Sequence, residues 1–134
     1  MSQTAPSPFS RLSILLVEDE LFAQKLAVRV LNQIGVQNIA VAKSGTDALT
    51  ILGYPNSKFD LIISDWQMPE MTGLSLLQRV RETWPDMPFI MLTGKTSGDF
   101  VLAAKDHGVN GYIAKPFAPN QLIAKIAAVL RIKI

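Results

Sequence analysis

Five side chains that could do chemistry come directly after short apolar stretches of the chain: Glu18, Asp19, Asp65, Thr93 and Lys115. Carboxylates brought within a few ångströms repel one another, so one takes up a proton unless a cation lies between them. Mg²⁺ suits that role because it prefers oxygen ligands and commonly uses one or two carboxylates. A carboxylate beside such a metal, opposite a lysine and a hydroxyl, can accept a phosphoryl group as an acyl phosphate. These residue types therefore predict phosphoryl-transfer chemistry.

The elements that would position these residues alternate along the chain. Five runs have the length of strands and are apolar throughout, as in a parallel sheet buried on both faces: 14–17, 39–42, 61–64, 89–92 and 111–114. Apolar residues at helical spacing follow each run. The alternation predicts an α/β fold, with a doubly wound five-stranded parallel sheet and five helices. Ligands of such sheets bind at the carboxyl ends of the strands, which is where the reactive residues fall.

Local signals mark where some of the helices begin and end. Gly35 is expected to stop the first helix, Ser44 to cap the second, and Pro119 to occupy the first turn of the last. The first helix carries one apolar stripe, which should face the sheet: Leu21, Phe22, Leu26, Val30 and Leu31.

Composition excludes several classes of protein. With 134 residues, 49% of them hydrophobic and 18% charged, the chain is one folded domain and not intrinsically disordered. A net charge of +2 is too small to suggest direct nucleic-acid binding, and no apolar run is long enough for membrane insertion. Zinc is disfavoured because there is no cysteine and His107 is the only histidine. Residues 1–10 are expected to be a flexible leader, residues 11–134 the domain, and the location cytoplasmic.

Four segments together carry a family resemblance: 16–20 (LVEDE), 64–73 (SDWQMPEMTG), 91–94 (MLTG) and 111–117 (GYIAKPF). Each occupies a predicted strand end, and the four occur in order. Over about residues 11–134 the sequence resembles the receiver domain of two-component response regulators, especially the single-domain chemotaxis-type regulators. The resemblance implies a flavodoxin-like sheet with strand order 2-1-3-4-5.

The same resemblance implies a role for each acid. Asp65 would accept the phosphoryl group and also bind Mg²⁺. Asp19 would bind the metal directly, and Glu18 directly or through water. The backbone carbonyl of Gln67 would supply a further metal ligand.

Four further positions would act on the phosphoryl group or respond to it. Thr93 would hydrogen-bond the phosphoryl group and Lys115 would pair with it. Tyr112 would change rotamer as Thr93 moves toward the phosphate. The bond before Pro116 would be cis, against the general preference of X-Pro bonds for trans.

The resemblance predicts a signalling switch that catalyses only its own phosphorylation and dephosphorylation. A sensor histidine kinase would supply the phosphoryl group. A downstream protein would bind the face made by the fourth helix, fifth strand and fifth helix. Lys125, Arg131 and Lys133 form either a basic patch on this face or an ordinary solvated helix end.

Two other classes of function remain open at this point. The chain could be a receiver fragment of a larger hybrid kinase, or an interaction module that is never phosphorylated. Retention of every key residue type argues against the second of these. An aspartate-nucleophile phosphatase of the haloacid dehalogenase type would need a second aspartate two residues after Asp65. That position is Gln67, which counts against a phosphatase.

Overall fold

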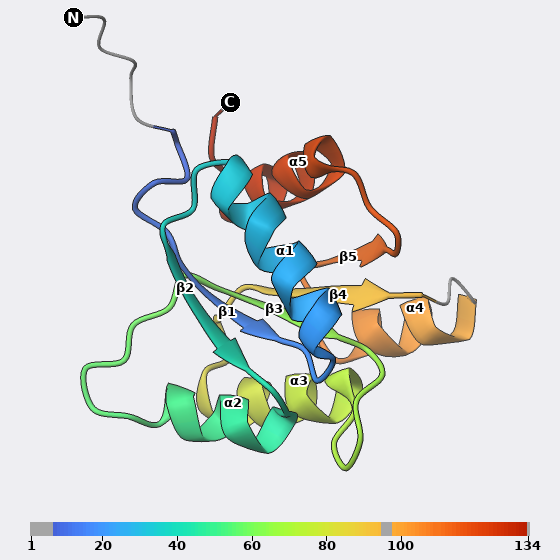
Figure 1. Cartoon of the computed structure of the whole chain (residues 1–134). Helices are drawn as coiled ribbons and strands as arrows, with labels where there is room; N and C mark the ends of the chain where they lie inside the picture. The colour runs from blue at the N-terminus through green and yellow to red at the C-terminus, as the bar shows by residue number, and fades with distance from the viewer. Residues whose placement is uncertain (1–6, 95–97, 134) are drawn as a thin grey trace, which may run out of the picture.

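The computed structural model describes residues 7–94 and 98–133 and shows a central sheet covered on both faces by helices (Figure 1). The strands are β1 (Ser13–Val17), β2 (Asn38–Ala42), β3 (Leu61–Asp65), β4 (Phe89–Thr93) and β5 (Gly111–Ala114). All neighbouring strands pair in parallel, in the order β2-β1-β3-β4-β5. The predicted doubly wound α/β fold and its strand order are confirmed.

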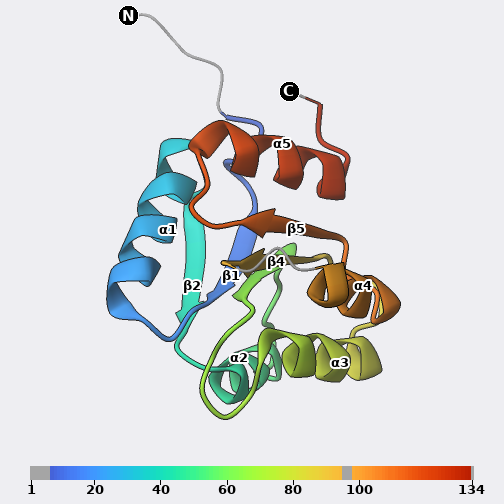
Figure 2. The same ribbon diagram turned by 90° about the vertical axis from the view of Figure 1, so that its right-hand side faces the viewer.

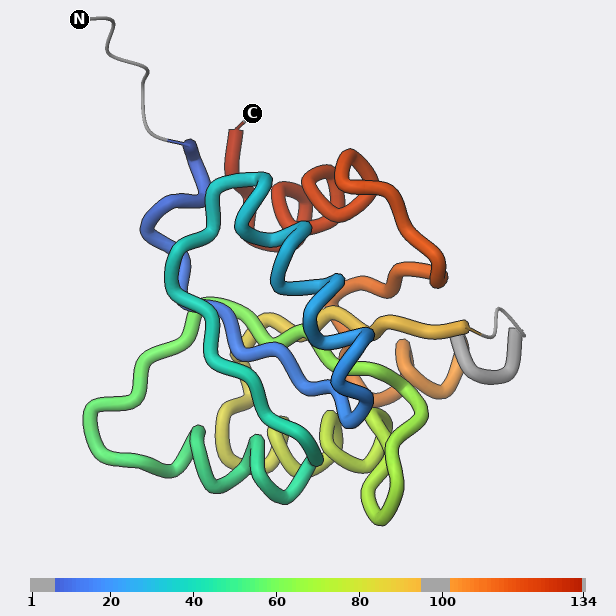
Figure 3. Tube along the Cα trace, viewed as in Figure 1, coloured from blue at the N-terminus to red at the C-terminus, as the bar shows by residue number. Residues whose placement is uncertain are grey.

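One helix follows each strand: α1 (Leu21–Gln33), α2 (Gly45–Leu52), α3 (Gly73–Thr83), α4 (Gly98–Asp106) and α5 (Pro119–Leu130). The view in Figure 2 separates two layers, with α1 and α5 on one face of the sheet and α2, α3 and α4 on the other. The Cα trace in Figure 3 shows each helix returning the chain to the far end of the sheet. All five strands therefore end at the same edge.

Each layer encloses its own hydrophobic core. Ile14, Leu16 and Ile63 point toward α1 and α5, and all three are at most 1% exposed. Leu15 and Ile62 point the other way, toward α2 and α3, and are fully buried. This alternation is the period-two pattern of a strand covered on both faces. The edge strand β2 differs, because Val41 is 38% exposed.

The helix ends follow the signals in the sequence. The Ser44 side chain accepts a hydrogen bond from the Asp47 backbone N–H, and Pro119 is the first residue of α5. Past the end of α1, Gly35 has a φ of 108°, a conformation that glycine adopts without strain. Thr72 caps α3 by accepting a bond from the Ser75 N–H, a cap the sequence analysis did not predict. In the part of the chain that the structure describes, no helix is long and apolar enough to cross a membrane.

The predicted apolar stripe on α1 is confirmed only in part. Leu31 is buried, but Leu21, Phe22 and Leu26 are 63%, 67% and 48% exposed. The three exposed residues lie in the first two turns of α1, whereas Leu31 lies near its end. The small residue Ala27, which the stripe omitted, is buried instead.

The described end of the expected leader is packed onto the domain. Phe9 is 2% exposed within the core under α1 and α5, and Ser7 Oγ donates a 2.7 Å hydrogen bond to the Ile34 carbonyl. Residues 7–10 thus contact the domain through Phe9 and Ser7, and the flexibility of the leader stays a prediction. Residues 1–6 of that prediction lie outside the described residues. The domain boundary at residue 11 stays a prediction.

Candidate functional site

The reactive residues predicted from the sequence meet at the carboxyl edge of the sheet. Asp65 and Thr93 are the last residues of β3 and β4, Glu18 follows β1, and Lys115 follows β5. The Lys115 ammonium nitrogen lies 3.0 Å from Asp65 Oδ1 and 3.1 Å from Glu18 Oε1. Three separate strands thus contribute to one charged cluster, because parallel strands end at a common edge.

Three acids in this cluster could hold a cation. Glu18, Asp19 and Asp65 each offer a carboxylate oxygen, and these atoms all lie within 4.8 Å of one another. Glu18 and Asp65 are 3% and 8% exposed, whereas Asp19 is exposed. The donor set is oxygen only and open to water on the Asp19 side, which fits Mg²⁺. The predicted metal ligand Gln67 lies just after β3, and its carbonyl as a ligand stays a prediction.

Burial and charge set the protonation of the cluster. Burial raises the pKa of Glu18, the hydrogen bond from Lys115 acts to lower it, and the nearby Asp65 charge raises it again. Burial acts to lower the pKa of Lys115, but its hydrogen bonds and charge pairing with Asp65 and Glu18 outweigh this, so the pKa is raised. Lys115 therefore keeps its charge at neutral pH. A cation near Glu18 would favour its ionised form.

Thr93 and Tyr112 lie along the same pair of strands. Thr93 is 4% exposed at the end of β4, and it pairs in register with Ala114 of β5. Tyr112 stands two residues earlier on β5, so it points to the same face of the sheet as Thr93. Tyr112 is 37% exposed, and Lys125 Nζ lies 5.7 Å from the centroid of its ring. The Lys115–Pro116 peptide bond is cis, as the resemblance implies.

The backbone that carries Asp65 is closely packed against the start of α3. The Gly73 N–H donates a 2.8 Å hydrogen bond to the Trp66 carbonyl, and the Trp66 N–H donates to the Leu92 carbonyl at 2.8 Å. A Cβ on Gly73 would lie 2.4 Å from the Asp65 carbonyl oxygen and 3.0 Å from the Trp66 Cα. Only a residue without a side chain allows this close approach.

We therefore expect Gly73→Ala to destabilise the protein by about 2–4 kcal/mol, because the clash is with backbone that cannot rotate away. Thermal or urea unfolding measures the loss. Gly94→Ala is the matched control, since a Cβ there meets nothing within 4 Å. Equal stability of the two variants would show that the β3–α3 turn relaxes without cost.

Two features near the site were not identified from the sequence. Gln24 on α1 donates a 2.7 Å hydrogen bond from Nε2 to the Glu18 carbonyl. A cavity of about 360 Å³ opens beside the charged cluster, lined by Glu18, Lys115 and apolar residues that include Leu26 and Phe117. A single glutamine on a helix gives no sequence signal of its partner, and the cavity depends on how α1 crosses the loop after β5.

The sequence is similar to those of known proteins over most of its length. Residues 14–127 match the family described as response regulator receiver domain. The chain is 38% identical over 117 residues to the chemotaxis protein CheY of Pseudomonas aeruginosa, covering 86% of this chain and 93% of that protein. It is 36% identical over 121 residues to a chemotaxis protein CheY homolog of Campylobacter jejuni, covering 89% and 92%.

The fold is similar to those of solved structures. Chemotaxis protein CheY4 of Vibrio cholerae superposes with a TM-score of 0.81 at 31% identity, covering 89% of this chain and 98% of that one. A response regulator receiver domain protein from Clostridium thermocellum gives a TM-score of 0.82 at 28% identity, covering 90% and 94%. Both the fold and most of the length are shared with these structures.

Proposed function

Because this chain belongs to the response regulator receiver domain family, we propose that it is a switch phosphorylated on Asp65 by a sensor histidine kinase. Family membership supports phosphorylation-dependent signalling in general. The acceptor residue, the donor, the metal and the output face are our assignments. The observation that carries them is the cluster in which Lys115 Nζ lies 3.0 Å from Asp65 Oδ1 beside Glu18 and Asp19.

The proposed reaction uses Asp65 as the nucleophile. A carboxylate oxygen attacks the donor's phosphorus, the bond between phosphorus and the donor histidine nitrogen breaks, and an acyl phosphate forms. Lys115 pairs with one phosphoryl oxygen, and the Thr93 hydroxyl donates a hydrogen bond to another. Glu18, Asp19, Asp65 and the Gln67 carbonyl would hold Mg²⁺, which when bound neutralises charge on the transferring group.

The proposed output follows from the new charge. A phosphoryl group adds about two negative charges and three strong acceptors at the end of β3. Thr93 would move toward it, and Tyr112 would enter the space that Thr93 leaves. Both residues lie on one face of the β4–β5 pair, which supports this coupling. The surface of α4, β5 and α5 would then bind a downstream protein, in the cytoplasm and without direct contact with nucleic acid.

The decisive experiment is incubation of the protein with acetyl phosphate and Mg²⁺, followed by intact-mass measurement. We expect a gain of one phosphoryl group that hydroxylamine removes, because acyl phosphates react with this nucleophile. The protein should also lose the group slowly without added enzyme. No uptake from either acetyl phosphate or a histidine kinase would favour an interaction module that is never phosphorylated. Rapid multiple turnover of a small phosphate ester would instead indicate a phosphatase.

Tyr112→Ala tests the proposed relay to the output face. In wild type, phosphorylation should change hydrogen–deuterium exchange in β5 and α5, and we expect the variant to lose at least half of that change. Tyr54→Ala is the matched control, because Tyr54 is an exposed tyrosine, 58% accessible, at the end of α2. Identical exchange responses in all three proteins would rule out the Tyr112 relay.

A further inference from the structure

One side chain of α1, that of Gln24, hydrogen-bonds the segment from Glu18 to Glu20. Gln24, in the first turns of the helix, donates from Nε2 to the Glu18 carbonyl at 2.7 Å. Its own backbone N–H donates to the Glu20 carbonyl at 2.9 Å. Gln24 therefore contacts both ends of the three-residue segment that carries two of the three clustered acids.

The other hydrogen bonds of this segment do not hold the Asp19 side chain, so the backbone sets the position of that side chain. The Glu18 N–H donates to the Ala42 carbonyl at 3.0 Å, and the Glu20 N–H donates to Glu18 Oε2 at 3.3 Å. Within the described residues, no hydrogen bond or ion pair is made by the exposed Asp19 carboxylate. The Glu18 carbonyl belongs to the planar peptide that leads into Asp19, so fixing that oxygen fixes the plane from which Asp19 projects.

The hydrogen bond from Gln24 is more important because the start of α1 has no side-chain cap. Its N-cap residue, Glu20, makes no side-chain capping hydrogen bond. In many helices a capping side chain fixes the entry of the chain. Here a side chain further along the helix reaches back to the preceding loop and ties it to the helix.

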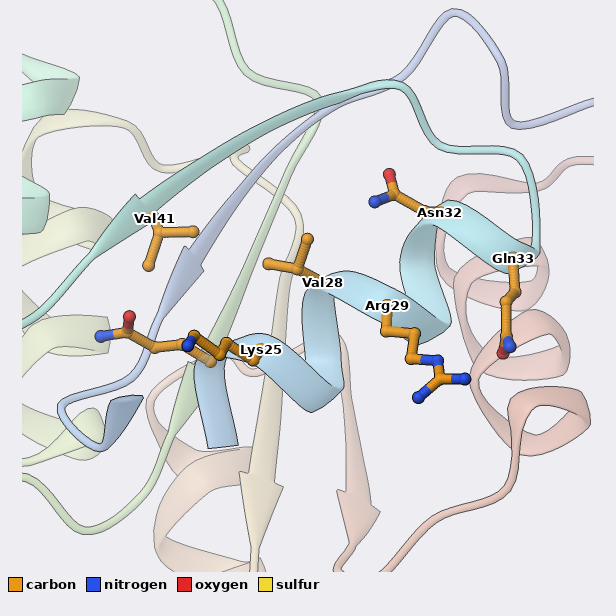
Figure 4. A pocket seen from close by; sticks show the side chains of 7 residues that line it. Lys25, Val28, Arg29, Asn32, Gln33 and Val41 are labelled. Atoms are coloured by element: carbon orange, nitrogen blue, oxygen red, sulfur yellow. The ribbon is translucent and has the colours of Figure 1, made fainter. Parts of the chain in front are cut away.

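The Gln24 side chain is not part of either hydrophobic core. Its side chain forms part of an open groove of about 620 Å³ between α1 and β2, together with Lys25, Val28, Arg29 and Val41. In Figure 4, Val28 and Val41 approach each other across the groove from the helix and the strand. Substitution of Gln24 thus leaves the two hydrophobic cores intact.

We propose that Gln24 is a positioning residue that holds Glu18 and Asp19 in the arrangement that binds Mg²⁺. This inference rests on the proposed function, because it assumes that the acidic cluster is a metal site. Outer-shell hydrogen bonds commonly control metal affinity by orienting the groups that ligate it. Gln24 does so through the backbone rather than through a ligating side chain.

The test compares Gln24→Met with Gln33→Met. Methionine keeps the length and helix propensity of glutamine but donates no hydrogen bond. Gln33 lies on the same helix and in the same groove, and within the described residues its side chain makes no hydrogen bond. Mg²⁺ affinity by isothermal titration calorimetry should fall roughly three- to tenfold in Gln24→Met and stay unchanged in Gln33→Met. Thermal midpoints of the metal-free proteins should differ by only a few degrees, as expected for the loss of one hydrogen bond.

A rescue experiment separates positioning from a structural defect. At saturating Mg²⁺, Gln24→Met should regain the wild-type rate of phosphoryl uptake from acetyl phosphate, whereas a misfolded site would stay slow. Equal Mg²⁺ affinity of wild type and Gln24→Met would overturn this inference alone. So would failure of the rescue, or an equal loss of affinity in Gln33→Met. A wild-type protein that binds no Mg²⁺ would overturn the proposed function together with the inference.

Discussion

Asp65→Asn is expected to take up no phosphoryl group from acetyl phosphate and Mg²⁺. The amide has the shape of the carboxylate but is not a nucleophile, and it also removes one negative charge from the acidic cluster. The loss should be complete, because we assign the neighbouring acids Glu18 and Asp19 to the metal and not to the phosphoryl group. Intact-mass measurement before and after hydroxylamine treatment reports the outcome directly.

The variant should remain folded, which keeps the result interpretable. Lys115 retains its 3.1 Å contact with Glu18, and removing the Asp65 charge relieves one of the effects that raise the pKa of Glu18. Asp106→Asn is the matched control, since Asp106 is an exposed aspartate at the end of α4. Continued hydroxylamine-labile labelling of Asp65→Asn would mean that another acid is the acceptor.

The sequence predicted the sheet well because strong, redundant signals specify it. β1, β3 and β4 are rich in large apolar residues, and the parallel arrangement follows from the helices between the strands. The clustering of Asp65, Lys115 and Glu18 could also be predicted, because strand ends of one parallel sheet must share an edge. In the structure, Lys115 contacts both acids.

Features that depend on exact distances were not predictable in the same way. Arg81 donates to the carbonyls of Met87 and Gly108 and to the Asn110 side chain, joining α3 to the segments before β4 and β5. Nothing in the sequence around Arg81 distinguishes it from a solvated arginine. The α1 stripe shows the same limit, because periodicity gives the direction of a side chain but not which part of the helix another element covers.

Lys115→Met is expected to slow phosphoryl uptake from acetyl phosphate by about 100-fold or more. Methionine preserves much of the length of the side chain but cannot pair with a phosphoryl oxygen. The wild-type ammonium lies 3.0 Å from Asp65 Oδ1, so the substitution removes a positive charge next to the atom that reacts. The rate measured by mass spectrometry tests this, with Lys58→Met as a control on an exposed lysine.

The same substitution should change how stability depends on pH. Burial raises the pKa of Glu18, and the hydrogen bond from Lys115 partly offsets this, so its removal raises that pKa further. A carboxyl whose pKa is raised in the folded state binds more protons there than in the unfolded chain. The free energy of unfolding therefore falls as the pH rises from the ordinary glutamate pKa through the raised one. The metal-free variant should lose more stability across this window than wild type, and Mg²⁺ should restore it by neutralising the acids. Parallel stability–pH curves for the two proteins would show that Lys115 does not compensate the charge of Glu18.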